Sequence, residues 1–226
     1  MALQGIKRSI VTINSKDHAQ LNILLKEEKD VAKDARAYAK QKAEAAKFMA
    51  SWGKEQAADL EDITHNLHNV FTEFSKFFND MSDHHVVFRA KLKEIRARED
   101  ALYDLRQKVK SAADKVKEAI KKQKPVDQLK GDLASLESQL ATQEGEHEGF
   151  KRAAFQEGMR GQFDALLVFG KKVQVAATFG NHLADQIPQG SLAPGQKLPP
   201  YLGAEVTARI YADFLRELRE LEPGAP

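Results

Sequence analysis

The chain has 226 residues, a formal net charge of +2 and no cysteine. Because 30% of its residues are charged, little apolar material remains for one large round core, which favours an elongated shape or an oligomer. The absence of cysteine excludes disulfides and thiolate catalysis and fits a cytosolic protein, and no apolar run reaches the roughly 20 residues that cross a bilayer.

Residues 1–16 are expected to form an N-terminal segment outside the helical part of the chain. Within it, Lys7, Arg8 and Ile10 belong to a stretch of basic and apolar side chains that predicts a short amphipathic membrane contact. The segment lacks the apolar centre of a secretory signal. Any membrane contact is therefore expected from one side of the bilayer.

The first expected helix covers about residues 17–50. Its apolar side chains recur every seven positions, at Leu24, Val31, Tyr38, Ala45 and Trp52. This spacing predicts one apolar stripe along a coiled-coil-like helix. The sequence Ser-Trp-Gly at 51–53 predicts the corner after it, because glycine commonly ends a helix.

The second expected helix is the longest, because no glycine or proline occurs at residues 54–124. At 1.5 Å per residue this stretch would form a rod of roughly 100 Å. Its apolar residues follow a near-heptad pattern, at Leu60, Ile63, Leu67, Val70, Phe74, Phe77, Met81, Phe88, Leu92, Ile95, Leu102, Leu105, Val109 and Val116. The pattern predicts a coiled-coil seam.

The third expected helix starts at about Val126 and contains several glycines. Two explanations of these glycines stay open: they allow neighbouring helices to pack closely, or they bend the rod. Residues 188–200 are predicted as a loop, and residues 203–221 as a short amphipathic helix. Together the elements predict an all-α fold, an elongated antiparallel coiled-coil helical bundle.

Charge is distributed unevenly along the second helix. Residues 54–85 contain two Lys and seven Asp or Glu, whereas residues 89–124 contain thirteen Lys or Arg and six Asp or Glu. A rod that is acidic at one end and basic at the other favours antiparallel pairing, or offers its basic end to phosphates. The alternative is a solvated helix with many i,i+4 charge pairs.

Within the basic half, Arg89, Lys93 and Arg96 lie at i, i+4 and i+7, within about 60° of one another on one helix face. Three cations presented together suit lipid head groups better than a single carboxylate. Lys91 and Arg98 lie beside them in the sequence. These five residues are the candidate lipid-binding site.

Other functions find less support in the sequence. Asp62 with His65, and Glu144 with His147, have the carboxylate–histidine spacing of di-iron bundles, but the further inward-facing carboxylates are missing, and His147 is predicted as a polar core position. Phosphate loops, nucleophile elbows and zinc spacings do not occur. The basic half has few aromatic residues to stack on bases. We therefore predict no catalytic residue, metal, cofactor or nucleic-acid partner.

Five short segments resemble a known family. They are SWG at 51–53, DIT at 62–64, FRAKLKEIR at 88–96, KRAAFQEGMRGQFDALL at 151–167 and PPYLG at 199–203. In this order and spacing they resemble the fungal eisosome core components, a BAR-domain family that builds furrows in the plasma membrane. The resemblance covers about residues 17–220.

The resemblance implies a BAR domain at residues 17–221, with residues 222–226 as a C-terminal tail. Two copies would pair antiparallel into a curved homodimer that assembles into filaments on phosphoinositide-rich membrane, at the cytoplasmic face of the plasma membrane. In the family a basic cluster on the second helix is understood to contact phosphatidylinositol bisphosphate. The matching positions are Arg89, Lys93 and Arg96, and all three are cationic.

Two features differ from the usual family pattern. The stretch before the first helix is short, and the acidic C-terminal tail common in the family is missing. The short N-terminal stretch favours the first alternative, a cytosolic coiled-coil interaction protein without membrane assembly, whereas the tail bears on regulation and on the recruitment of partners. The second alternative is a di-iron helical-bundle enzyme.

Overall fold

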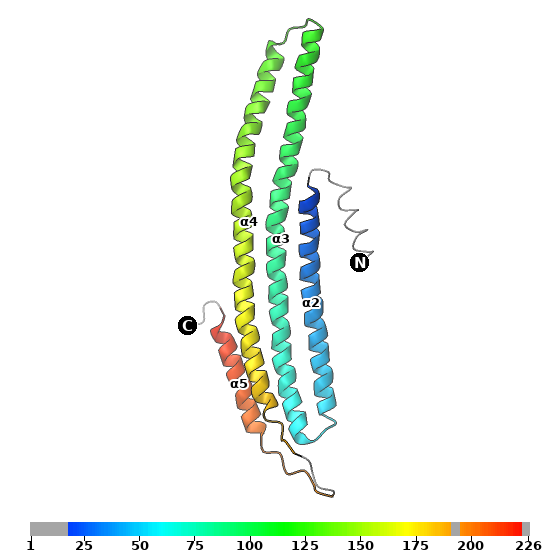
Figure 1. Ribbon diagram of the computed structural model, residues 1–226, viewed down its shortest axis with the longest axis vertical. Helices are drawn as coiled ribbons and strands as arrows, with labels where there is room; N and C mark the ends of the chain where they lie inside the picture. Colours follow the sequence, from blue (N-terminus) through cyan, green and yellow to red (C-terminus); the bar gives the residue numbers. More distant parts are fainter. Residues whose placement is uncertain (1–17, 191–194, 223–226) are drawn as a thin grey trace. The chain divides into compact units, whose positions relative to one another are not determined.

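The computed structural model describes residues 18–190 and 195–222, and within them it contains helices and no strand. The helices are α2 (Ala19–Gly53), α3 (Ala58–Lys121), α4 (Asp127–Ala184) and α5 (Ala204–Glu220) (Figure 1). The predicted all-α fold class is confirmed. The expected helices agree with the observed ones to within a few residues, because the glycines and prolines that interrupt helices are local signals.

The chain divides into two compact units. Unit 1 combines Met1–Lys29 with Val86–Gly161, and unit 2 combines Asp30–His85 with Gln162–Pro226. Each of the three long helices therefore contributes one segment to each unit. Each unit also has a hydrophobic core of its own.

The core of unit 1 forms around large side chains of α3. Its buried members are Leu25, Phe88, Leu92, Ile95 and Ala154. Gly158 of α4 lies directly over Phe88, since a Cβ at this glycine would stand 2.5 Å from Phe88 Cδ2. At Gly131 a Cβ would meet nothing within 4 Å. Close packing therefore explains Gly158 but not Gly131.

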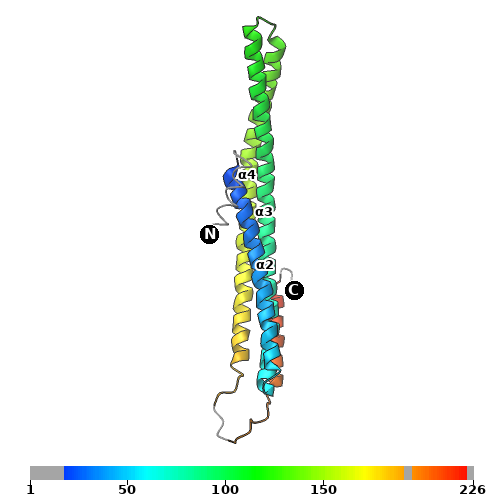
Figure 2. The ribbon, with the colours of Figure 1, turned by 90° about the vertical axis from the view of Figure 1, so that its right-hand side faces the viewer.

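The core of unit 2 is completed by α5. Phe214 of α5 is fully buried, and the other buried members are Val70, Phe77, Ala176, Phe179, Leu183 and Leu218. Two views show α5 running beside the unit 2 ends of α3 and α4 (Figures 1 and 2). Burying one such phenylalanine contributes about 2–3 kcal/mol. The predicted amphipathic helix thus docks through its apolar face.

The apolar stripe predicted on α2 is not the face that packs within the chain. Its large members are 36–49% exposed, and they are Leu24, Val31, Tyr38 and Trp52. The buried face lies beside it and consists mostly of alanine, at Ala32, Ala35, Ala39 and Ala46, together with Leu25. Alanine allows α2 to approach α3 closely, whereas the larger side chains stay outside.

Two hydrogen bonds confirm how closely α2 and α3 approach each other. Buried Ser82 donates from Oγ to the Ala32 carbonyl of α2, at 2.9 Å. Arg89 donates from Nε to the Leu25 carbonyl, also at 2.9 Å. Because the Ser82 side chain is short, its bond to a carbonyl inside α2 shows that the two helix backbones approach closely at Ala32.

We expect Gly53→Ala to lower the free energy of unfolding by about 1–3 kcal/mol. The reason is that a Cβ at Gly53 would overlap the Thr64 hydroxyl, which is held by a 2.7 Å bond to the Leu60 carbonyl. Gly131→Ala is the matched control, since it meets nothing and should stabilise its helix by up to about 1 kcal/mol. Chemical denaturation measures both, and equal stabilities would contradict the prediction.

Candidate functional site

Three of the predicted cations lie on the side of α3 that faces α2. Arg89 bonds the Leu25 carbonyl, as described above, and Arg96 donates from Nη1 to Asn22 Oδ1 at 3.1 Å. At about 100° per residue, Lys93 shares this face with them. Lys93 is exposed and has no ion pair or hydrogen bond within the described residues. The structure thus ties the two arginines to α2 and leaves the lysine available.

The other two predicted cations lie on the opposite side of α3, toward α4. Lys91 Nζ is 3.0 Å from Glu157 Oε1, and the hydrogen bond to Glu157 raises the pKa of the Lys91 ammonium. The Arg98 guanidinium lies 3.6 Å from the centre of the Phe150 ring. Both contacts connect α3 to α4. The five candidate residues therefore form two sets that cannot face one flat surface together.

A second group of cations lies where α3 and α4 connect, a region called here the hairpin tip (residues 115–130). It contains six lysines and only two acidic residues. Lys115, Lys121 and Lys124 are exposed and lack an ion pair within the described part of the chain, and Ile120 beside them is 55% exposed. These lysines are among the thirteen basic residues at 89–124, outside the five predicted lipid-binding positions. The concentration of lysines around Pro125 is the feature of the sequence that could have identified this region as a candidate site.

Three segments that carry the family resemblance meet in unit 2. Asp62 of DIT accepts two hydrogen bonds at Oδ2, from Tyr201 Oη of PPYLG at 2.8 Å and from Thr207 Oγ1 at 2.5 Å. Gly53 of SWG packs against Thr64 of DIT. These segments are therefore a structural joint that attaches the start of α5 to the α2–α3 corner.

The contacts of Asp62 also concern the alternative that the chain is a di-iron enzyme, because Asp62 is one of the candidate metal ligands. The Asp62 carboxylate is engaged by Tyr201 and Thr207, and Glu144 pairs with Arg106 at 2.8 Å. Among residues 18–190 and 195–222, no group of three or more His, Asp or Glu side chains is arranged to hold a metal ion. His147, predicted as a polar core position, is 5% exposed, so that prediction is confirmed.

The predicted N-terminal contact residues Lys7, Arg8 and Ile10 lie outside the described residues, so their prediction is untested. In the part of the chain that the structure describes, none of the helices combines the length and apolar content needed to cross a bilayer.

The fold and the basic surfaces define an all-α protein built from long paired helices with clustered cations on α3. The model of the family described as eisosome component PIL1 matches residues 4–224. The chain belongs to this family, as its short segments indicated.

Several curated relatives are similar to most of this chain. The chain is 26% identical over 211 residues to a probable sphingolipid long chain base-responsive protein, pil1, of Schizosaccharomyces pombe, covering 92% of this chain and 60% of the relative. It is 27% identical over 204 residues to the sphingolipid long chain base-responsive protein PIL1 of Saccharomyces cerevisiae, covering 89% and 60%. The chain therefore spans about three fifths of these relatives' length.

We expect stability to fall above about pH 10 because of Tyr201. Burial, and then the hydrogen bond to Asp62, raise the pKa of Tyr201 to about 12, whereas an unfolded tyrosine titrates near 10. Between these two values the unfolded chain loses a proton that the folded chain keeps, so unfolding becomes easier as pH rises.

Tyr201→Phe should remove this part of the alkaline loss, while Tyr103→Phe, at a 42% exposed tyrosine, should leave it unchanged. Denaturation near pH 9 and near pH 11 measures the difference. The same alkaline loss in the native chain and in Tyr201→Phe would contradict the prediction.

Proposed function

We propose that this chain is a non-catalytic scaffold of eisosome type that binds phosphoinositide-rich plasma membrane from the cytoplasmic side. It would do so as a BAR-type homodimer that assembles further and shapes membrane curvature. Family membership supports the proposal. Because the chain spans only about three fifths of the relatives, their response to sphingolipid long chain bases, stated in their names, comes to it as part of the proposal.

The observation that carries the proposal is a set of exposed lysines on α3 that have no ion pair within residues 18–190 and 195–222. Lys93, Lys115, Lys121 and Lys124 need not break a contact within the described chain in order to meet a phosphate. A cation near an anionic membrane surface gains about 1 kcal/mol. Exposed Ile120 lies among the lysines of the hairpin tip and suits the boundary between head groups and acyl chains.

The arginines play a different part in this proposal. Arg89 and Arg96 are engaged by α2, so removing them would disturb the packing of α2 as well as any lipid contact. They add positive potential around Lys93 without leaving their partners. Lys93 is therefore the residue that best separates lipid binding from folding.

Exposed apolar side chains of unit 2 support the homodimer. On α2 these are Val31, Tyr38, Phe48 and Trp52, and on α4 they are Phe163, Leu166 and Leu167. Their exposed fractions range from 43% to 69%. Clusters of this kind on a soluble surface mark interaction sites, and a second copy would bury them.

We expect the native chain to pellet with vesicles that contain phosphatidylinositol bisphosphate, and to pellet less at high salt because the attraction is screened. Changing Lys115, Lys121 and Lys124 together to Glu should lower vesicle binding by about tenfold or more. Lys93→Glu alone should lower it by a smaller factor.

The matched control changes Lys33, Lys40 and Lys54 to Glu, because these lysines are exposed in unit 2 and the change in charge is equal. Vesicle binding of the native chain and of both triple variants is measured by co-sedimentation at two salt concentrations. Equal losses in both triple variants would show a general effect of net charge and refute the assigned site. No pelleting of the native chain would favour the cytosolic interaction protein.

We expect the native chain to sediment as a dimer, and Phe48→Glu and Leu167→Glu to weaken that dimer. The reason is that each change places a charge on a side chain that is more than 65% exposed in the single chain and desolvated in the dimer. Sedimentation equilibrium measures the association. Gln41→Glu, at an exposed polar position of α2, is the control. A monomer at all concentrations would refute the BAR-type assembly.

A further inference from the structure

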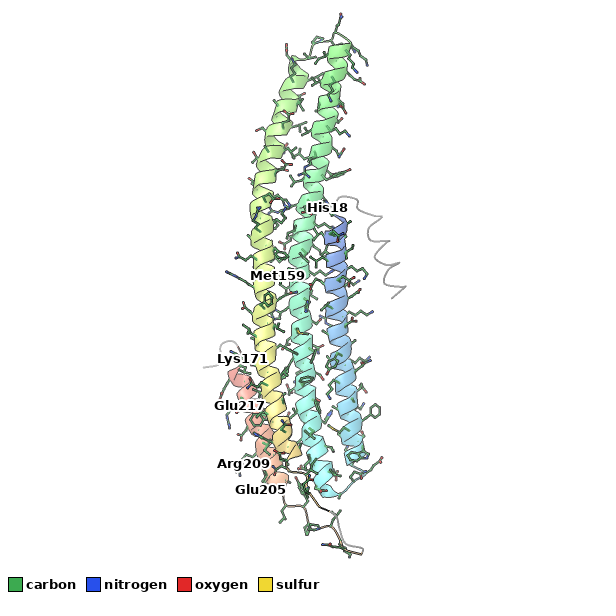
Figure 3. The ribbon with its side chains drawn as sticks, in the orientation of Figure 1. His18, Met159, Lys171, Glu205, Arg209 and Glu217 are labelled. Atoms are coloured by element: carbon green, nitrogen blue, oxygen red, sulfur yellow. The ribbon has the colours of Figure 1, made fainter. Side chains whose placement is uncertain are left out.

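A group of ionisable side chains lies at the very start of α2. His18 directly precedes the helix (Figure 3). Its Nδ1 is 3.1 Å from Glu99 Oε2, and its Nε2 is 3.4 Å from Asp100 Oδ1. The His18 side chain is only 13% exposed. One imidazole ring thus lies between two carboxylates of α3.

A second histidine reaches the same glutamate from α4. His147 Nε2 is 3.6 Å from Glu99 Oε1, and its Nδ1 is buried without a hydrogen-bond partner. Protonating His147 would therefore leave a buried N–H unsatisfied, which is costly. Protonating His18 instead places a positive charge between Glu99 and Asp100. The arrangement favours His18 as the group that changes charge.

The other charged groups around this cluster each have a partner, and one of them pairs with Asp100 itself. On the α4 side Lys151 pairs with Glu148, and Arg106 of α3 pairs with Glu144 of α4. On the α2 side of α3, Arg96 Nε is 3.7 Å from Asp100 Oδ2. Glu99 is different, because its ion-pair partners within the described residues are the two imidazoles.

The cluster is also open to solvent. A pocket of about 540 Å³ is lined by His18, Glu99 and His147, together with the first residues of α2. Water can therefore exchange protons with the imidazole without unfolding of the unit. Histidine is the side chain that most often changes its charge within the physiological pH range.

We propose that His18 is a protonation-dependent latch that fastens the start of α2 to Glu99 and Asp100 of α3. Protonated His18 forms ion pairs with both carboxylates and holds the start of α2 against α3, whereas neutral His18 holds it less firmly. This inference stands on the geometry of unit 1 and does not depend on lipid binding.

The amide of Asn22 reports on the latch, because it donates to the His18 carbonyl at 2.9 Å in the first turn of α2. Hydrogen–deuterium exchange at residues 20–25, corrected for intrinsic rates, is measured near pH 6 and near pH 8. In the native chain we expect the amides to be about three- to tenfold more protected from exchange at the lower pH. This modest factor is expected because a partly exposed ion pair stabilises only weakly.

Three variants separate the latch from other effects. His18→Gln should show the lower protection at both pH values, and His18→Arg, with its permanent charge, the higher protection at both. Glu99→Gln should lower protection at the acidic pH. His65→Gln, at an exposed histidine of unit 2, is the control and should keep the native response.

Two results would overturn the latch. One is equal protection of the native chain at both pH values. The other is a pH response of His18→Gln that matches the native response. Exchange at residues 88–95 in the α3 core of unit 1 is followed in the same samples, so that a variant that loosens the whole unit is recognised and set apart from one that releases only the first turn of α2.

Discussion

The close approach of α2 to α3 is the constraint on which the other features depend. Small residues line the buried face of α2, and two side chains of α3 consequently reach its backbone carbonyls, Ser82 at Ala32 and Arg89 at Leu25. A larger side chain in place of these alanines would separate the helices and break the bond from Ser82. The large apolar side chains of α2 are therefore left on the outside.

The cations of α3 fall into two groups according to their contacts. Arg89, Arg96, Lys91 and Arg98 connect α3 to its neighbours through a carbonyl, an amide, a carboxylate and an aromatic ring. Guanidinium groups suit such contacts because they form several directed bonds and stack on rings. The lysines at the hairpin tip remain hydrated point charges, which suits a fluid anionic surface with no fixed geometry.

The motifs that carry the family resemblance are mostly packing motifs. SWG, DIT and PPYLG meet through Gly53, Asp62 and Tyr201, and FRAKLKEIR meets KRAAFQEGMRGQFDALL through Phe88 and Gly158. A shared fold therefore accounts for these segments without a shared reaction. The exposed lysines of the hairpin tip lie outside the resembling segments.

The sequence by itself determined the all-α class, the approximate ends of the long helices and the buried state of His147, because helix-breaking residues and apolar periodicity act locally. It did not determine which face of α2 is buried. A seven-residue repeat of large apolar side chains marks one stripe on α2, but the alanines beside it repeat with the same period. Which of the two stripes packs against α3 depends on the distance between the helices, and the sequence does not give that distance. The tertiary structure also decided which cations are engaged and which are free, since their partners Leu25, Asn22 and Glu157 lie more than 60 positions away along the chain.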